Sequence, residues 1–407
     1  GVSISMLTGQ NGILNRAAEA KEKTNDSQIQ ENVKMEEYES ILKEYATGIQ
    51  STKYTKPYLP SNKFRKVEGD LDSGIVIEEQ ETGSQYVWVE VPTSLYNIST
   101  YNNNEKNKPS SSTDSANIEY CLKKYTEIYR QNSAYIDSYY EDTDNSDEWF
   151  NNATEYDTAY KNILKSVYEN GGFWIGRYEA GIDYQKETIR HFGSEYTIKH
   201  EATQQVLTKA NMYPYNWVRR SQAKSLAENV EAGNYTSSLM FGLQWDLVLK
   251  YIENKTAEKS SNENEARTKI QNQLNSDSID IGNYYNATFT LNRGKFAQYG
   301  LLTTIFDFNS NDKNDLVSNR NKLAQDSNKN AILLTTGASE KNKLQNIYDL
   351  AGNVWEWTLS NPQSETVKCA SRGGDFSVDG SIYTASYTNG AYTNINVSSV
   401  GFRVSIY

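Results

Sequence analysis

The sequence predicts an α+β protein in which a long N-terminal helix precedes a domain that mixes strands and helices. Residues 13–46 contain no proline and carry an apolar stripe at roughly helical spacing, which favours one continuous helix. β-branched and aromatic side chains dominate residues 86–91 and 172–179, as is typical of strands. Helical candidates follow at residues 219–230 and 244–255.

The N-terminal helix has few apolar side chains for its length. A helix of about 35 residues would extend about 50 Å. Its apolar stripe consists of Ile29, Val33, Ile41, Leu42 and Tyr45. Because such a stripe buries only a thin face, we expect much of the helix to stand in solvent or to touch neighbouring subunits.

The start of the chain carries a first resemblance. Residues 7–24, LTGQNGILNRAAEAKEKT, are similar to the segment that follows the membrane helix in Gram-positive type IV pilin-like proteins. The resemblance implies that residues 1–50 are a pilin-like helix whose membrane part is missing. It further implies a location at the surface or pilus of a Gram-positive-type bacterium, with other pilin subunits as partners and membrane contact only through the missing segment. A generic amphipathic helix is the alternative.

Composition argues against several functional classes. The net charge is -11, so a nucleic-acid backbone would be repelled and no nucleic-acid partner is expected. No apolar run of about 18 residues is present, so this form has no transmembrane helix. The two histidines, His191 and His200, are too few for a multi-histidine metal site. Cys121 and Cys369 are not a disulfide framework, and whether they pair stays open.

The rest of the chain divides into a short linker and one large domain. Residues 51–85 begin with Pro57 and Pro60 among several tyrosines, which favours a linker leading into the domain. Residues 86–407 form the domain. Its polar insertions are expected at residues 102–117, 141–148, 253–278 and 309–328.

Three motifs near the C-terminus are the most informative part of the sequence. They are NIYDLAGNVWEWT at 346–358, RGGDF at 372–376 and GFRV at 401–404, and FWIGRYE and QWD fit the same pattern upstream. Together they resemble the formylglycine-generating-enzyme (sulfatase-modifying factor) family. The resemblance runs from about Tyr86 to the C-terminus. It implies a variant of the C-type lectin fold for the domain.

The resemblance also implies a structural calcium ion. The matching ligands are the carboxylates of Asp349 and Glu356 and the backbone carbonyls of Gly352 and Val354. Oxygen ligands from a turn suit a hard cation, and such a site would stabilise the fold rather than do chemistry. The alternative is that Glu356 only caps backbone amides. Arg403 is expected in a buried structural ion pair.

The chemistry of the family's founding enzymes is not expected in this chain. That chemistry oxidises a substrate cysteine with two active-site cysteines that bind copper, a soft ion that needs thiolates. The matching positions are Val378 and Tyr383, and Cys369 lies before the glycine pair. Two histidines do not supply the iron site of other relatives. We therefore predict no catalytic residues and no redox cofactor.

Residues 373–407 have an unusual composition, with no Lys, Glu, Gln, Met or Trp. Most of the residue types that remain can be reached from asparagine codons by changing adenines. This pattern is similar to the variable region of retroelement-diversified proteins, which often end in a Gly-Phe-Arg motif. The resemblance implies a variable ligand-binding segment at residues 373–404.

Tyr, Ser and Asn are also the residues that antibody loops favour, because they combine amphipathic contact with adaptable hydrogen bonding. The expected aromatic anchors are Tyr383, Tyr387 and Tyr392. The expected polar contacts are Asp375, Ser377, Asp379, Ser381, Thr388, Asn389, Asn394 and Asn396. The alternative is an ordinary polar edge of the fold.

The sequence thus predicts a non-catalytic, surface-displayed protein that binds a protein or glycan ligand. Three alternatives stay open. They are a structural minor pilin or pseudopilin, a divergent metal-dependent family enzyme, and a calcium-dependent sugar lectin, which would need an open calcium site.

Overall fold

The computed structural model describes most of the chain. It covers residues 25–130, 134–141, 149–183, 205–288, 290–294, 296–300, 304–305, 331–364 and 366–407. The pilin-like segment at residues 7–24, both histidines and the polar insertion at 309–328 therefore lie outside the described residues.

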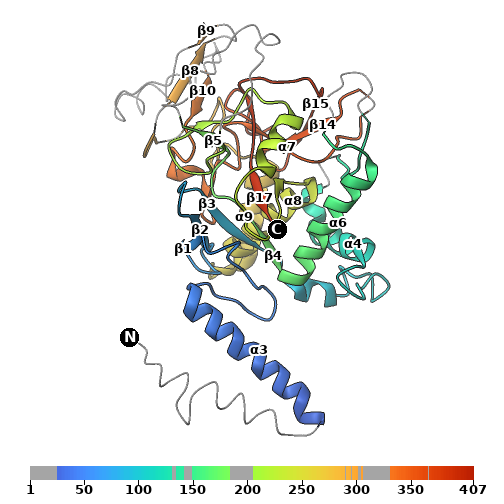
Figure 1. The fold of residues 1–407 in the computed structure, drawn as a ribbon. Coiled ribbons are helices and arrows are strands. Elements are labelled where there is room, and N and C mark those ends of the chain that lie inside the picture. The colour runs from blue at the N-terminus through green and yellow to red at the C-terminus, as the bar shows by residue number, and fades with distance from the viewer. Residues whose placement is uncertain are drawn as a thin grey trace.

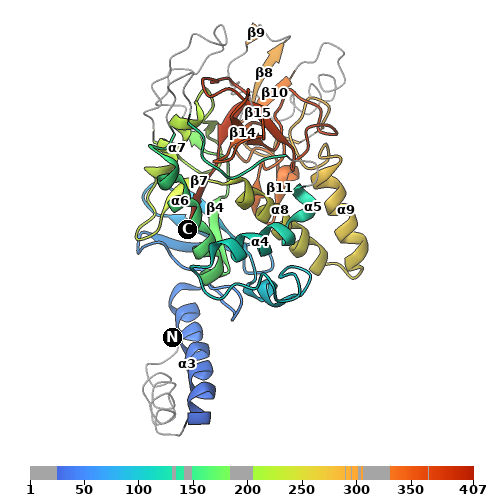
Figure 2. The ribbon, with the colours of Figure 1, turned by 90° about the vertical axis from the view of Figure 1, so that its right-hand side faces the viewer.

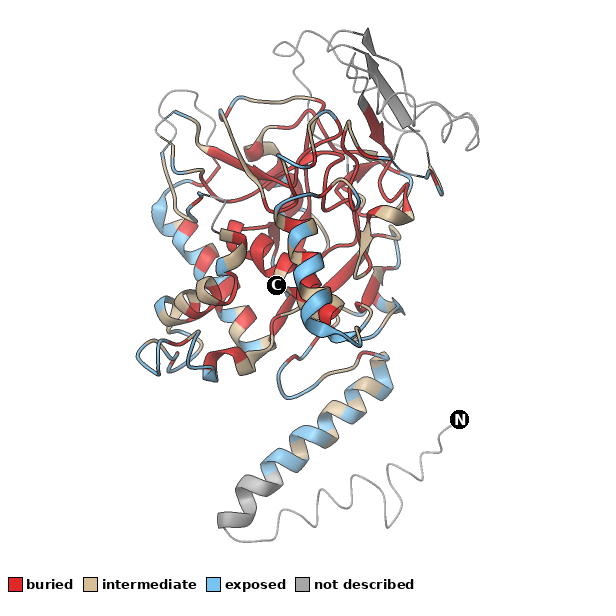
Figure 3. Cartoon of the chain, turned by 180° about the vertical axis from the view of Figure 1, so that it is seen from behind, coloured by how far each residue is buried: buried red, intermediate tan, exposed pale blue. Residues whose placement is uncertain are grey.

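The N-terminal helix α3 (Asn25–Thr47) extends away from the rest of the molecule, and its C-terminal end leads into the domain (Figures 1 and 3). Val33, Ile41 and Tyr45 are all more than half exposed. The expected helix with little buried surface is therefore confirmed for its described part. None of the described helices combines the length and the hydropathy that crossing a bilayer requires.

A six-stranded antiparallel sheet lies at the centre of the domain, in the order β1-β2-β3-β4-β17-β7. The strands are β1 (Phe64–Glu68), β2 (Val76–Glu79), β3 (Gln85–Glu90), β4 (Gly172–Gly176), β7 (Ser237–Leu239) and β17 (Val404–Ile406). Strands β3 and β4 confirm the two predicted strands. Residues 51–85, expected as a linker, instead contribute β1 and β2 to the sheet.

Helical segments of the described chain pack around this sheet and against one another. They are η2 (Thr93–Asn97), α4 (Ser115–Tyr125), α5 (Glu127–Arg130), α6 (Ala153–Asn170), α7 (Arg220–Glu228), α8 (Gly242–Glu258) and α9 (Glu263–Asn275). Helices α7 and α8 match the helical candidates. Helix α9 falls in the predicted polar excursion at 253–278, and it is anchored by the buried side chains of Ile270 and Leu274.

Helix α8 is buried on almost every side, and a carboxylate from a distant loop caps its N-terminus. The amides of Gly242 and Leu243 donate to Asp137 at 2.9 and 3.1 Å. Burial raises the pKa of Asp137 to about 6, although these hydrogen bonds and Arg130 oppose the shift.

A second sheet has the order β15-β14-β13-β16, with β13 and β16 parallel and the other pairs antiparallel. Its strands are β13 (Trp355–Trp357), β14 (Cys369–Arg372), β15 (Thr388–Ala391) and β16 (Val400–Phe402). Trp355 and Trp357 are both buried on β13. Figures 1 and 2 place β14 and β15 at the end of the molecule opposite to α3.

The remaining described elements are short. They are β5 (Gly181–Ile182), β6 (Tyr213–Pro214), β8 (Phe296–Gly300), β9 (Thr304–Ile305), β10 (Ala331–Leu334), η3 (Glu340–Asn342), β11 (Lys343–Leu344) and β12 (Ile347–Tyr348). The architecture is thus mixed α and β, as expected. Cys121 on α4 and Cys369 on β14 are both buried and are not joined by a disulfide.

Candidate functional site

Residues 373–404, the expected variable segment, follow β14 and begin with a tight glycine turn. Gly373 and Gly374 have φ values of 94° and 81°, in the region that favours glycine. A Cβ atom on Gly374 would lie 2.5 Å from both the Tyr284 ring and the carbonyl oxygen of Tyr383. The Tyr284 hydroxyl donates to the carbonyl of Gly373 at 2.8 Å. The start of the segment is therefore fixed by packing and leaves no room for a side chain.

An aromatic cluster of Trp355, Tyr383 and Tyr387 supports the middle of the segment. The ring centroids of Trp355 lie 5.9 Å from Tyr383 and 6.0 Å from Tyr387, and the two tyrosine rings lie 5.0 Å apart. Trp355 is buried, whereas Tyr383 and Tyr387 are partly exposed. Edge-to-face contacts of this kind hold the rings in place, so little freedom remains to be lost on binding.

The other expected contact residues lie at different depths. Tyr392 is 53% exposed. Among the expected polar contacts, the exposed residues are Ser377, Ser381 and Asn394, and the partly exposed ones are Asp379, Thr388, Asn389 and Asn396. Thr388 and Asn389 lie on β15, at the edge of the second sheet. Apart from Asp375, the expected contact residues therefore reach the surface to some degree.

Asp375 lies beneath the surface, contrary to the expectation of an accessible contact. Its side chain is almost fully buried, and the backbone amide and the hydroxyl of Ser377 both donate to its Oδ1 at 2.6 Å. Burial raises the pKa of Asp375 to about 6, against the hydrogen bonds that favour the charged form. Asp375 thus stabilises the turn at Ser377 through hydrogen bonds from a buried position.

Asp379 also organises its own loop. It accepts hydrogen bonds from Asn286 Nδ2 at 2.9 Å, the Tyr285 hydroxyl at 3.2 Å and the Ser381 amide at 2.8 Å. Burial alone would raise its pKa, but the hydrogen bonds from Ser381 and Asn286 outweigh burial and lower it. The contacts of Tyr285 and Asn286 with Asp379 could not be predicted, because these two residues lie far from the segment along the chain.

The pKa values of Asp375 and Asp379 are shifted in opposite directions, so the two residues should affect the pH dependence of stability differently. As pH falls from 7.5 to 5, native Asp375 takes up a proton before the unfolded chain does, because its pKa of about 6 exceeds the ordinary 3.8. Wild type should therefore gain on the order of 1 kcal/mol of stability relative to Asp375→Asn over this interval. Urea unfolding at both pH values measures the gain. Asp379→Asn is the control, and wild type should show no such gain relative to it.

A buried ion pair joins the segment to the core. Arg372 donates from Nη2 to Asp246 Oδ1 at 2.8 Å and to the carbonyl of Ser386 at 2.9 Å, and both charged side chains are fully buried. The hydroxyl of Tyr135 also donates to Asp246. Trp245 donates from its indole nitrogen to the carbonyl of Ala385 at 2.9 Å. Helix α8 thereby positions the backbone that carries Tyr387.

The expected calcium ligands lie in a separate buried acidic cluster, defined here as Glu179, Asp349, Glu356 and Arg403. Arg403 donates to the Glu356 carboxylate from Nε at 3.0 Å and from Nη2 at 2.6 Å. It also donates to the carbonyls of Gly176 and Tyr348 at 3.0 and 2.9 Å. The expected buried ion pair of Arg403 is therefore confirmed, and its partner is Glu356.

The other two carboxylates are held by neutral donors. Asp349 accepts from the Gly337 amide at 2.7 Å, and Glu179 accepts from Asn353 Nδ2 at 2.7 Å. Burial raises the pKa of all three carboxyl groups, that of Asp349 to about 6, and like-charge neighbours add to the rise at Glu179 and Glu356. Arg403, which hydrogen-bonds to Glu356, also interacts through its charge with Glu179 and Asp349.

Among the described residues, no group of three or more His, Cys, Asp or Glu side chains is arranged to hold a metal ion. Two buried side-chain oxygens in the described segment before Asp349 nevertheless lack a partner. Within the described residues, Asn342 Oδ1 and Ser339 Oγ are buried atoms without a hydrogen-bond partner, and Asn342 Nδ2 lies 3.4 Å from Asp349. A carboxylate has about four lone-pair sites, so the pair with Arg403 does not consume Glu356. A Cβ on Gly352 would overlap the backbone of Asn283, which explains the glycine in the motif.

Comparison of the chain with protein-family models identifies a known domain in its C-terminal part. Residues 293–406 match the Sulfatase-modifying factor enzyme 1-like domain, abbreviated FGE-sulfatase. The matched range contains all three C-terminal motifs, the variable segment and three members of the buried acidic cluster. No curated protein matches the chain.

Proposed function

We propose that this chain, which carries a Sulfatase-modifying factor enzyme 1-like domain at residues 293–406, is a non-catalytic, surface-displayed ligand-binding protein. Its binding surface is the exposed part of residues 373–404, and its ligand is a protein or a glycan. We also propose a C-type-lectin-like fold for the domain and a pilin-like origin for the N-terminal helix.

The observation that carries the proposal is the aromatic cluster with its surroundings. Tyr383 and Tyr387 are partly exposed but braced by buried Trp355, and Ser, Thr and Asn side chains lie around them. Binding hot spots are typically such rigid aromatic anchors bordered by adaptable polar groups. The position of β15 opposite to α3 further supports display, because a stalk at one end leaves the other end free (Figure 2).

Diversification by a retroelement is part of the proposal. The composition of residues 373–407 supports it, and so does the contrast between exposed positions such as Ser381 and buried ones such as Gly374 and Arg403. The flanking DNA provides the test. A near-copy of codons 373–404 that differs mainly at adenines, beside a reverse transcriptase gene, is the expected finding, and its absence would remove this part.

Replacing the tyrosines that reach the surface is expected to weaken ligand binding. A ligand is first identified on arrays of glycans and purified surface proteins, and its Kd is then measured. Tyr387→Ser and Tyr392→Ser should each raise the Kd about 30-fold, as loss of a hot-spot side chain does. Tyr45→Ser is the matched control, because Tyr45 on α3 is 62% exposed and lies at the other end of the molecule.

Two alternative functions predict different outcomes. If the protein is a structural minor pilin, the tyrosine variants keep any ligand binding and change only assembly with other subunits. If it is a divergent enzyme, titration with copper(I) or iron(II) reveals a redox metal near Val378 and Tyr383. Either outcome would overturn the proposed function.

A further inference from the structure

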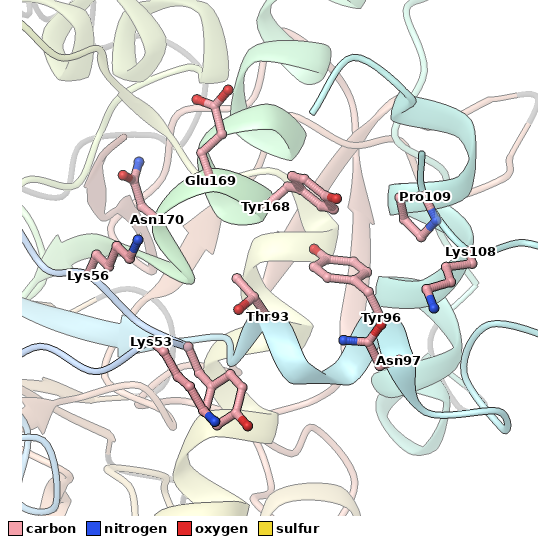
Figure 4. Close-up of a pocket in the computed structure, with 11 residues that line it drawn as sticks. Lys53, Lys56, Thr93, Tyr96, Asn97, Lys108, Pro109, Tyr168, Glu169 and Asn170 are labelled. Atoms are coloured by element: carbon pink, nitrogen blue, oxygen red, sulfur yellow. The ribbon is translucent and has the colours of Figure 1, made fainter. Parts of the chain in front are cut away.

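A pocket at the α3 end of the domain is lined by groups that the binding surface does not use. Its walls come from the chain that follows α3, from η2, from the loop before α4 and from the end of α6 (Figure 4). Its volume is about 380 Å³, which is within the range of small-molecule sites. Figure 4 shows Lys53 and Lys56 on one side of the pocket and Lys108 on the other.

The pocket is positively charged on a protein whose net charge is -11. It is lined by Lys53, Lys56 and Lys108 against one carboxylate, Glu169. Glu169 lies 3.9 Å from Lys165, which partly neutralises it. In the part of the chain that the structure describes, neither Lys53 nor Lys56 pairs with a carboxylate, whereas Lys108 lies 2.9 Å from Glu105. Neither Lys53 nor Lys56 is therefore neutralised by a described carboxylate, although Lys53 Nζ lies 4.9 Å from the centroid of the Tyr54 ring.

A nearby lysine agrees with the positive charge of the pocket, and a buried tyrosine forms part of the pocket wall. The pKa of Lys43 is lowered, first by burial and then by the positive charge of Lys56. Tyr96, which lines the pocket, is almost fully buried, and its hydroxyl has no hydrogen-bond partner among the described residues. Because this hydroxyl is itself buried, Tyr96 forms part of the pocket wall and does not offer a hydrogen bond to a ligand.

We propose that this pocket is a second binding site, which takes a small sugar that carries an oxyanion such as phosphate or carboxylate. Lys53 and Lys56 pair with the oxyanion through charge-assisted hydrogen bonds. Thr93, Asn97 and Asn170 line the same pocket and supply neutral groups for sugar hydroxyls. This site is independent of residues 373–404, so it does not rest on the proposed function.

Calorimetric titration of the full chain with four probes tests the site. Glucose 6-phosphate or glucuronate should bind at least tenfold more tightly than glucose, and the tighter of the two identifies the oxyanion. Inorganic phosphate should bind more weakly than glucose 6-phosphate, because it makes no hydroxyl contacts. Lys53→Ala combined with Lys56→Ala should weaken binding of the charged sugar at least tenfold.

Two control variants separate this site from general charge and from the other surface. Lys106→Ala removes an exposed lysine of the loop that carries Lys108 but does not line the pocket, so binding should not change. Tyr387→Ser should also leave it unchanged. Equal binding of glucose, of inorganic phosphate, or of the Lys106 and double-lysine variants would overturn the proposal, as would the absence of binding by both charged sugars.

Discussion

Replacing Arg403 by methionine is expected to destabilise the protein by about 3–5 kcal/mol, because it leaves a buried carboxylate without its partner. Arg403 and Glu356 are at most 1% exposed, and Arg403 also satisfies the carbonyls of Gly176 and Tyr348. Urea unfolding, followed by tryptophan fluorescence, measures the loss.

Two further variants identify the cause of this loss. Glu356→Gln combined with Arg403→Met removes both charges and should recover part of the stability, since the orphaned carboxylate is gone. Arg65→Met is the matched control, because Arg65 pairs with Glu78 at 2.9 Å but is largely exposed. That variant should lose at most about 1 kcal/mol. A similar small loss for Arg403→Met would contradict a structural role for the pair.

Calcium is expected to stabilise the protein by about 2.7 kcal/mol when present at 100 times its Kd, through the proposed site at Asp349 and Glu356. We propose this site because the buried acidic cluster holds more carboxylates than cations, and because Asn342 Oδ1 and Ser339 Oγ are buried without a hydrogen-bond partner among the described residues. Thermal unfolding at pH 7.5 with calcium, and with a chelator, measures the difference. Asp349→Asn should abolish it, while exposed Asp280→Asn should not.

The calcium effect should shrink as the solution is acidified. The folded-state pKa of Asp349 is raised to about 6, above its ordinary 3.8, so the metal-free native protein takes up a proton before the unfolded chain does. The metal-free protein therefore gains stability as pH falls through 6 toward 4. Protons then compete with calcium for the carboxylate, and the increment at pH 5 should be smaller than at pH 7.5. An equal response to magnesium, or none to chelation, would reject the calcium proposal.

The local order of residue types was enough to predict the strands and helices whose apolar residues form clear runs. Residues 86–91 and 172–179 are recognisable as strands because branched and aromatic side chains follow one another, and Trp245 marks the buried helix α8. Helix α9 escaped prediction because only Ile270 and Leu274 are buried in an otherwise polar segment. Strands β1 and β2 escaped because the prolines before them suggested a linker.

Depth within the variable segment could not be predicted from its composition. Asp375 and Ser377 are both small polar residues two positions apart, yet one is buried and the other exposed. The glycine turn decides this difference, and its packing depends on Tyr284, far away in sequence. The partner of Arg372 is unpredictable for the same reason, since Asp246 reaches it only through the tertiary fold.

Strand β17 is inserted between β4 and β7, although it is the last strand in the described chain. The sheet cannot close until residues 404–406 are in place, so its closure brings together widely separated parts of the chain. Residues 373–399 run between β14 and β16, and the pairing of both strands with β13 in the second sheet holds both ends of the segment. Exposed side chains of this segment can therefore be replaced extensively while the strands on either side of it keep the same register.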